Sequence, residues 1–180
     1  MRKQVNPKEL DALLRAAEVA CAGNGARLTQ RRRQVLSELM QSSSPLSAYE
    51  VLDLCNRSTT SAMPAMSVYR ILDFLEQQLL VHRLSSSNKY VSCAHIACDH
   101  NHFQKTHFLL CDGCSSVEEV DATEEASEAL EQMAKTVGFK LTTQQFELSG
   151  ICTTCQKNAG GREKIRQRPQ WQPLPVTLSA

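Results

Sequence analysis

The strongest constraint on the fold comes from two pairs of cysteines. Each pair has the spacing C-x-x-C: Cys111 and Cys114 lie in "FLLCDGCSSVEE", and Cys152 and Cys155 lie in "GICTTC", with 37 residues between the pairs. One C-x-x-C turn places two thiolates close enough to share an ion, and two such turns complete the four-thiolate shell of a structural Zn²⁺ site. Gly113 and Gly150 are expected to help these turns. The sequence therefore predicts a C-terminal unit that folds around a metal.

A redox use of the same pairs remains open at this point. A redox-active C-x-x-C pair usually occurs singly at a strand-to-helix junction, so a thiol oxidoreductase is the less favoured alternative. The 180 residues include eight cysteines, no apolar run long enough to cross a bilayer, and an N-terminus whose interspersed charges are unlike a signal peptide. We therefore expect a cytoplasmic protein whose cysteines are ligands or core residues, since disulfides are rare in that compartment.

The first half of the chain has the pattern of a winged helix-turn-helix. Helical spacing of apolar residues predicts helices over residues 7–22, 30–41, 48–56 and 68–78. Thr29 and Ser67 are the expected N-caps of the second and fourth helices. Two short apolar runs around "SSSN", residues 79–84 and 89–93, then predict a hairpin that would form the wing.

Several residues of this half are candidates for DNA contacts. Tyr69 and Arg70 begin the fourth predicted helix and face away from its apolar stripe, and recognition helices contact bases through their N-terminal residues. Arg31, Arg32 and Arg33 begin the second helix and suit phosphate contacts. Residues 1–84 carry 11 Lys and Arg against 8 Asp and Glu, whereas residues 85–156 carry 4 against 10. A solvated face that happens to carry Tyr and Arg is the alternative.

The second half predicts a small α/β unit, so the fold class is α+β. Strands are expected over residues 108–111 and 117–121, on either side of the first cysteine pair. An amphipathic helix is expected over residues 124–138, with Leu130 and Met133 on its apolar face, and a strand over residues 139–152 leads into the second pair. From Ala159 onward, Gly, Pro and charge without periodicity predict a disordered tail.

All five histidines fall within 26 residues of one another, from His82 to His107. Cys93, Cys98 and Asp99 lie among them. A polar loop with incidental histidines is one interpretation. The sharper one is a second metal site, in which a cysteine ligand favours Zn²⁺ over harder ions. The histidines are His82, His95, His100, His102 and His107.

In this order and spacing, the motifs resemble the ferric uptake regulator superfamily, and within it the zinc uptake regulator branch. The resemblance spans about residues 27–155 and rests on "RLTQRRRQVL", "SAYEVLDL", "SVYRILDFLEQQLLVHRL", "NKYVSC", "HFLLCDGCSSVEE" and "GICTTC". It implies a dimeric, metal-sensing repressor. The domains would be a winged-helix DNA-binding domain at 1–84, a metal-binding hinge at 85–103, a dimerisation domain at 104–158 and the tail at 159–180.

The resemblance also implies the roles of individual residues. The structural zinc would be bound by Cys111, Cys114, Cys152 and Cys155. The regulatory zinc would be bound by His82, Cys93, a histidine of the connector and Glu119, with His102 as the chosen histidine and His100 and His107 as rivals. Tyr49, Tyr69 and Arg70 resemble DNA-contacting positions. Relatives often have glycine where this chain has Ser115, so the turn there is expected to differ slightly.

The expected function is repression of zinc-uptake genes by a homodimer that binds operator DNA when a regulatory Zn²⁺ occupies the hinge. Two zinc ions per chain are expected. An iron or peroxide sensor of the same superfamily is the alternative, but those sensors typically lack a cysteine such as Cys93 at the sensing site. An enzyme is not expected, because the H-x-E with P-C-x-x-C of zinc deaminases and the HExxH of metalloproteases are both missing from the sequence.

Overall fold

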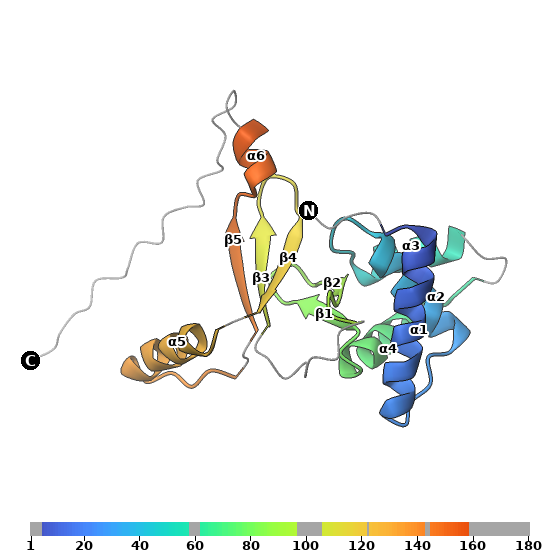
Figure 1. Cartoon of the computed structure of the whole chain (residues 1–180), viewed down its shortest axis with the longest axis horizontal. Helices are drawn as coiled ribbons and strands as arrows, with labels where there is room; N and C mark the ends of the chain where they lie inside the picture. Colours follow the sequence, from blue (N-terminus) through green and yellow to red (C-terminus); the bar gives the residue numbers. More distant parts are fainter. Residues whose placement is uncertain (1–4, 58–61, 97–105, 122, 143–144, 159–180) are drawn as a thin grey trace, which may run out of the picture.

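The protein is described by a computed structural model that covers residues 5–57, 62–96, 106–121, 123–142 and 145–158. Figure 1 shows the N-terminal helices gathered on one side, a hairpin next to them, and a second sheet that rises beside the hairpin. No helix within these ranges is both long enough and apolar enough to span a bilayer. The tail predicted to be disordered lies outside the described residues.

The N-terminal domain has the predicted order of a winged helix. Its four helices enclose one apolar core with Leu36 and Leu72 fully buried in it. They are α1 (Pro7–Gly23), α2 (Gln30–Gln41), α3 (Ala48–Arg57) and α4 (Ala65–Gln77). Thr29 is the N-cap of α2 as expected, but it caps through backbone geometry alone, without a side-chain hydrogen bond.

Helix α4 begins earlier than predicted. Ser67 is not its N-cap, because the helix begins at Ala65 and Pro64 occupies the capping position. The Ser67 N–H already bonds to the carbonyl oxygen of Pro64 at 2.9 Å. Alanine and methionine are good helix formers, so the first turn extends back to the proline. Tyr69 and Arg70 therefore lie in the second turn of α4 rather than in its first.

A two-stranded hairpin follows α4 and forms the wing. It consists of β1 (Val81–Leu84) and β2 (Lys89–Ser92), paired antiparallel so that His82 is opposite Val91. Asn88 takes a positive φ of 53° in the connecting turn, a conformation that asparagine tolerates better than most residues. The predicted domain boundary at residue 84 falls inside this hairpin, because β2 lies beyond it and pairs with β1.

The second domain is a three-stranded sheet with the order β4-β3-β5. Strand β3 pairs antiparallel with β4 and parallel with β5, and helix α5 makes the crossover between β4 and β5. The strand predicted over residues 139–152 is confined to β5, and a short helix that was not predicted follows it. The elements are β3 (Thr106–Cys111), β4 (Val117–Asp121), α5 (Glu124–Thr136), β5 (Phe146–Gly150) and α6 (Thr153–Asn158).

Helix α5 forms where its periodicity predicts, but its apolar face is not buried. Met133 is 66% exposed, and Val137 and Phe139, just after the helix, are each 70% exposed. Ser127 is the one buried residue of α5. Figure 1 shows α5 extending away from the sheet instead of packing along it. Within the described part of this chain, no element covers its apolar face.

The wing packs against one face of the second sheet. Four buried side chains form a small core between them: Leu84 and Val91 from the wing, and Phe108 and Val117 from the sheet. In the register of the sheet, Phe108 is opposite Glu119 on one side and Glu147 on the other. Because opposite residues share a face, this row of three side chains points toward the wing.

Candidate metal centres

The four cysteines of the two C-x-x-C pairs gather at one end of the second sheet. Their sulfur atoms all lie within 4.8 Å of one another, and Sγ of Cys114 is 3.7 Å from Sγ of Cys152. Four sulfurs placed tetrahedrally at about 2.3 Å from one Zn²⁺ would be about 3.8 Å apart. The structure therefore brings the four predicted ligands together at a spacing that fits a tetrahedral metal.

The redox alternative has one feature in its favour. The second pair opens α6 directly after β5, which is the strand-to-helix setting typical of redox-active pairs. Its sulfurs nevertheless face the first pair: the Cys152 N–H donates to Sγ of Cys111 at 3.2 Å, and Cys155 lies against Gly113. None of the described cysteines forms a disulfide. The arrangement favours one shared ion over two separate redox pairs.

The environment of these sulfurs suits thiolates that surround a cation. The hydrogen bond from the Cys152 N–H is the main reason that the pKa of Cys111 is lowered to about 6. By contrast, hydrogen bonds to Cys114 and Cys152 raise the pKa of Cys155 to about 12. Several thiolates this close repel one another, and a divalent cation among them removes that repulsion. The donor set therefore fits Zn²⁺.

Gly113, in the first cysteine pair, is required because a larger side chain would contact Cys155 too closely, and not because of its backbone conformation. A Cβ added to Gly113 would lie 3.0 Å from Sγ of Cys155 and 3.1 Å from its Cβ, whereas one added to Gly150 would meet nothing within 4 Å. Neither glycine has a positive φ; the residue of this turn that does is Ser115, at 58°. Glycine adopts that conformation without strain, so serine makes this turn less favourable than glycine would.

Gly113→Ala is expected to weaken metal retention at the four-cysteine site. The new methyl group pushes Cys155 away from the other sulfurs, and overpacking of this kind costs about 1–3 kcal/mol. If the whole cost appears in the release step, zinc is lost to a chelator roughly fivefold to 150-fold faster. The measurement is zinc release to a coloured chelator over time. Gly150→Ala is the matched control and should release zinc at the wild-type rate; equal rates for both variants would contradict the close approach.

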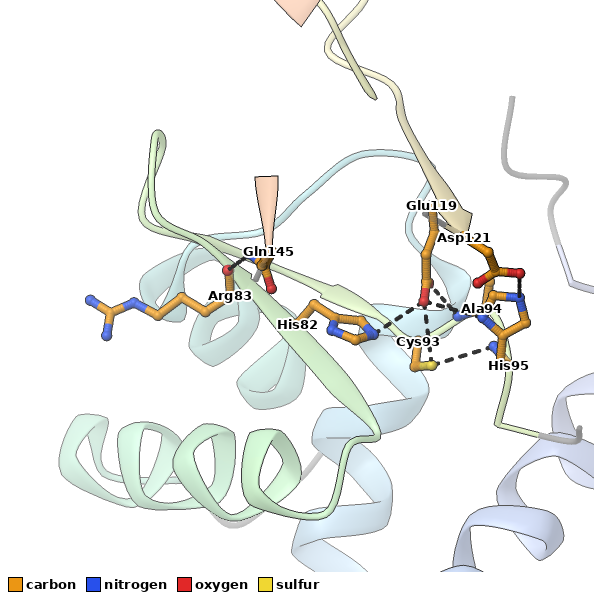
Figure 2. A network of polar contacts seen from close by, with 8 residues as sticks. All are labelled: His82, Arg83, Cys93, Ala94, His95, Glu119, Asp121 and Gln145. Atoms are coloured by element: carbon orange, nitrogen blue, oxygen red, sulfur yellow. Dashed lines mark hydrogen bonds and ion pairs between the residues drawn. The ribbon is translucent and has the colours of Figure 1, made fainter. Parts of the chain in front are cut away.

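A second cluster lies where the wing meets the second sheet (Figure 2). It consists of His82, Cys93 and Glu119 and is called the hinge cluster below. One ligand atom from each of His82, Cys93 and Glu119 lies within 4.8 Å of the other two. Oε1 of Glu119 is 3.2 Å from Nε2 of His82 and 3.7 Å from Sγ of Cys93. In a tetrahedral zinc site these separations would be about 3.3 Å and 3.6 Å. The three side chains come from β1, from the residue after β2, and from β4.

His82 and Glu119 both have features of metal ligands. Nε2 of His82 is buried and lies 3.2 Å from Oε1 of Glu119, so the imidazole and the carboxylate point at each other. The Glu119 side chain is only 1% exposed. Burial acts to raise its pKa, but the neighbouring His82 and the Ala94 N–H, which donates to Oε2 at 2.7 Å, lower it to about 2. Glu119 is thus held as a buried anion, which a cation between these groups would neutralise.

The remaining histidines are only partly placed. His100 and His102 lie outside the described residues, as does Cys98. His107 pairs with Val120 and therefore lies on the opposite face of the sheet from Glu119, where its ring packs edge-on against Phe146. The structure thus contradicts His107 as a rival ligand for the hinge cluster. His107 remains buried, and neither ring nitrogen has a hydrogen-bond partner among the described residues.

His95 is a contact of the hinge cluster to which the sequence interpretation gave no role. Its Nδ1 lies 3.3 Å from Oε1 of Glu119, and its Nε2 lies 3.9 Å from Oδ2 of Asp121 (Figure 2). A ring that faces a ligand group on one side and a carboxylate on the other is a common arrangement around metal sites. The position of His95, two residues after the predicted ligand Cys93, could have indicated that it lies near the hinge site.

The candidate DNA contacts lie on the N-terminal domain. Tyr49, at the start of α3, is 66% exposed, and its ring lies edge-on to that of Tyr69 with centroids 6.2 Å apart. Arg70 on α4 and Arg31 on α2 are exposed. These four residues are accessible or half-buried, and their contacts with DNA remain predictions.

The other two arginines of α2 already have partners within the domain. The Arg32 guanidinium lies 3.3 Å from the centroid of the Phe74 ring and donates to the carbonyl oxygen of Arg27 at 2.6 Å. Arg33 forms ion pairs with Glu18 at 2.5 Å and Asp11 at 2.9 Å, which tie α2 to α1. Arg33 therefore has a structural role, and phosphate contacts by Arg32 or Arg33 would compete with these partners and remain predictions.

Comparison with known proteins agrees with this architecture. Residues 23–149 match the profile of the ferric uptake regulator family. The zinc uptake regulation protein of Escherichia coli (strain K12) is 36% identical over 146 residues, which is 79% of this chain and 81% of that protein.

Two solved structures are also similar. A zinc uptake regulator complexed with zinc and DNA aligns with a TM-score of 0.71 and 32% identity, covering 83% of this chain and 96% of its own. The crystal structure of holo XcZur aligns with a TM-score of 0.68 and 35% identity, covering 82% and 99%. The chain belongs to the ferric uptake regulator family, within its zinc uptake regulator branch.

Proposed function

We propose that this chain is a zinc-responsive transcriptional repressor, which binds operator DNA as a dimer and represses zinc-uptake genes. The observation that carries the proposal is the position of the hinge cluster. His82 belongs to the wing of the N-terminal domain and Glu119 to the second sheet, while Cys93 ends the wing. Occupation of such a cluster by an ion favours the one domain arrangement in which all ligands meet, and so shifts the population toward it.

The proposed DNA-binding arrangement follows from the winged helix. In a dimer, two copies of α4 can enter major grooves at related half-sites if the domains are held at the right separation. Arg70 and Tyr69 would reach base edges, Tyr49 would support them from α3, and Arg31 would contact phosphate. Without zinc at the hinge, the domains sample other arrangements and the affinity for operator DNA falls.

The exposed apolar surface of the second domain supports a dimer. Leu109 on β3 and Leu148 on β5 lie on the sheet face that points away from the wing, and they are 44% and 54% exposed. Met133 and Phe139 of the α5 region are also exposed. Exposed large apolar side chains on one domain are typical of a surface that another protein chain covers. We therefore assign dimerisation to the domain that follows the wing, which the sequence places at residues 104–158.

We propose two zinc ions per chain, one in each cluster. The four cysteines would hold the first permanently, as a closed structural site. His82, Cys93 and Glu119 would hold the second, with a histidine as the fourth ligand. His102 remains the predicted residue for that position, and His95 is the histidine that the described structure brings nearest. When bound, the metal would supply only a positive charge and a tetrahedral geometry, since the protein acts as a regulator and not as an enzyme.

The thiolate of Cys93 separates this proposal from its alternatives. Soft thiolate ligands select zinc over the harder ions sensed by iron and peroxide regulators. A thiol oxidoreductase would need accessible cysteine pairs, whereas the sulfurs of both pairs face one common centre. A regulator of this kind acts on chromosomal DNA, so we place it in the cytoplasm.

Zinc-dependent DNA binding is the direct test. With purified full-length protein, a promoter fragment of a zinc-transporter gene should be retarded in a gel when free Zn²⁺ is present. A chelator that removes only the more weakly bound zinc should release the DNA fragment. The affinity of the protein for the fragment should change by tenfold or more. The same concentrations of Fe²⁺ should restore little binding. DNA binding that persists after the second zinc is removed would contradict the proposal.

A further inference from the structure

The tip of the wing contacts the second domain through residues that are not metal ligands. The carboxylate of Glu147 on β5 accepts two backbone hydrogen bonds from the wing turn. The Ser85 N–H donates to Oε1 at 2.6 Å and the Ser86 N–H donates to Oε2 at 3.0 Å. Gln145, just before β5, donates to the carbonyl oxygen of Arg83 at 2.9 Å and to Glu147 at 3.4 Å.

Glu147 and the hinge cluster hold the two ends of the same hairpin. Glu119, Phe108 and Glu147 form one row across β4, β3 and β5, so all three point toward the wing. Glu119 lies beside His82 and Cys93 near the ends of the strands that face the hinge, Phe108 packs under the ring of His82, and Glu147 caps the turn. Figure 2 shows the Arg83–Gln145 contact on one side of the wing and the cluster of ligands on the other.

The contacts of Glu147 are those of an ionised carboxylate. Burial acts to raise its pKa, but the hydrogen bonds from Ser86 and Ser85 outweigh burial, and the pKa lies below its ordinary value. Hydrogen bonds from backbone N–H groups to a charged acceptor are stronger than those between neutral groups. None of these contacts involves a metal ligand, so they can form whether or not the hinge cluster is occupied.

We infer that Glu147 is a positioning residue for zinc sensing: a metal-independent clamp that holds the wing on the second domain and so preassembles the hinge site. This inference rests on the proposed function. The apparent affinity of a site equals its intrinsic affinity reduced by the fraction of molecules in the competent arrangement. By raising that fraction, Glu147 lowers the zinc concentration needed to activate the protein.

The test is Glu147→Gln in the full-length protein. The variant keeps the size of the side chain, but one oxygen becomes an NH₂ group that faces a backbone N–H. Zinc affinity of the second site, measured by competition with a chelator dye, should fall on the order of tenfold, with the number of zinc ions per chain unchanged at saturation. With the four-cysteine site loaded and the hinge site empty, X-ray scattering should show a larger radius of gyration for the variant than for the wild type. Glu128→Gln, on the exposed polar side of α5, is the charge-matched control and should change neither quantity.

The possible outcomes are distinct. Equal zinc affinity, and equal dimensions when only the hinge site is empty, for wild type and Glu147→Gln would overturn the clamp while leaving the zinc sensor intact. Lack of a second zinc in the wild type would instead overturn the proposed function. If Glu147→Gln lowers the melting temperature of the protein, Gln145→Ala gives a second reading, because it removes the bonds from Gln145 to the Arg83 carbonyl and to Glu147 but keeps the Glu147 carboxylate and its two backbone bonds. A smaller affinity loss in the same direction supports the clamp, and no loss contradicts it.

Discussion

Cys152→Ser is expected to release the structural zinc and unfold the second domain. The described core between the wing and this domain has only four buried side chains, and the apolar side of α5 is exposed. A unit with so little core depends on its metal, and structural zinc contributes about 10–16 kcal/mol to the folding of small metal-bound domains. Metal analysis should find about one zinc fewer per chain, sedimentation should show monomers, and DNA binding should be lost at every zinc concentration.

The control for this variant is Cys55→Ala. Cys55 lies in the core of the N-terminal domain, fully buried, and burial raises the pKa of its thiol to about 11, so it is an inert packing residue. Its loss should leave a small cavity and reduce stability by about 1 kcal/mol, with zinc content and dimerisation unchanged. A Cys152→Ser protein that retains the full zinc content and remains dimeric would refute the structural site.

Unlike Cys152→Ser, Glu119→Ala is expected to keep the zinc of the four-cysteine site. It should abolish the response of DNA binding to zinc at the hinge site. Removing a buried anionic ligand leaves His82 and Cys93 without the group that both face. The affinity of the hinge for zinc should fall by more than about a hundredfold, beyond the 10–100-fold effect of changes around a ligand shell. Calorimetric titration and gel retardation of one preparation measure both effects, and Glu128→Ala serves as the control.

A second variant separates metal preference from metal binding. Cys93→Ser replaces the thiolate by a hydroxyl, so the hinge should lose more affinity for Zn²⁺ than for Fe²⁺ or Mn²⁺. Loss of both zinc ions in Glu119→Ala, or of neither, would contradict its assignment to the hinge alone. Wild-type zinc response in Cys93→Ser would contradict a thiolate ligand.

The sequence predicted well what depends on local spacing. Cysteine spacing indicated a four-sulfur group, and helical periodicity located all four helices of the winged helix, because both signals act over a few residues. The start of α4 was wrong by one turn, since the helix extends back through Ala65 and Met66, and Pro64 before them has the extended conformation of a cap residue. The gathering of His82 with Glu119 followed from family resemblance and not from any local pattern.

What the sequence could not predict depends on register and on neighbours. Whether His107 shares a face with Glu119 is decided by the pairing of β3 with β4, and a shift of one residue would reverse it. Periodicity identified the apolar face of α5 but not what covers it. The clamp of Glu147 joins residues more than 60 positions apart through backbone N–H groups of serines, which carry no signal in the side-chain sequence.

The short turn between β3 and β4 places a limit on the lengths that this segment can take. Cys111 ends β3, the turn carries Cys114, and Glu119 follows as the third residue of β4. Inserting or deleting one residue in the turn would move every side chain of β4 to the other face, so that Glu119 would point away from His82. A change of two residues would restore the face but shift Glu119 by about 6.6 Å along the strand. Surviving variants of this gene should therefore tolerate substitutions in the turn far better than changes in its length. The length of this segment sets the position of the sensing metal site relative to the permanent one.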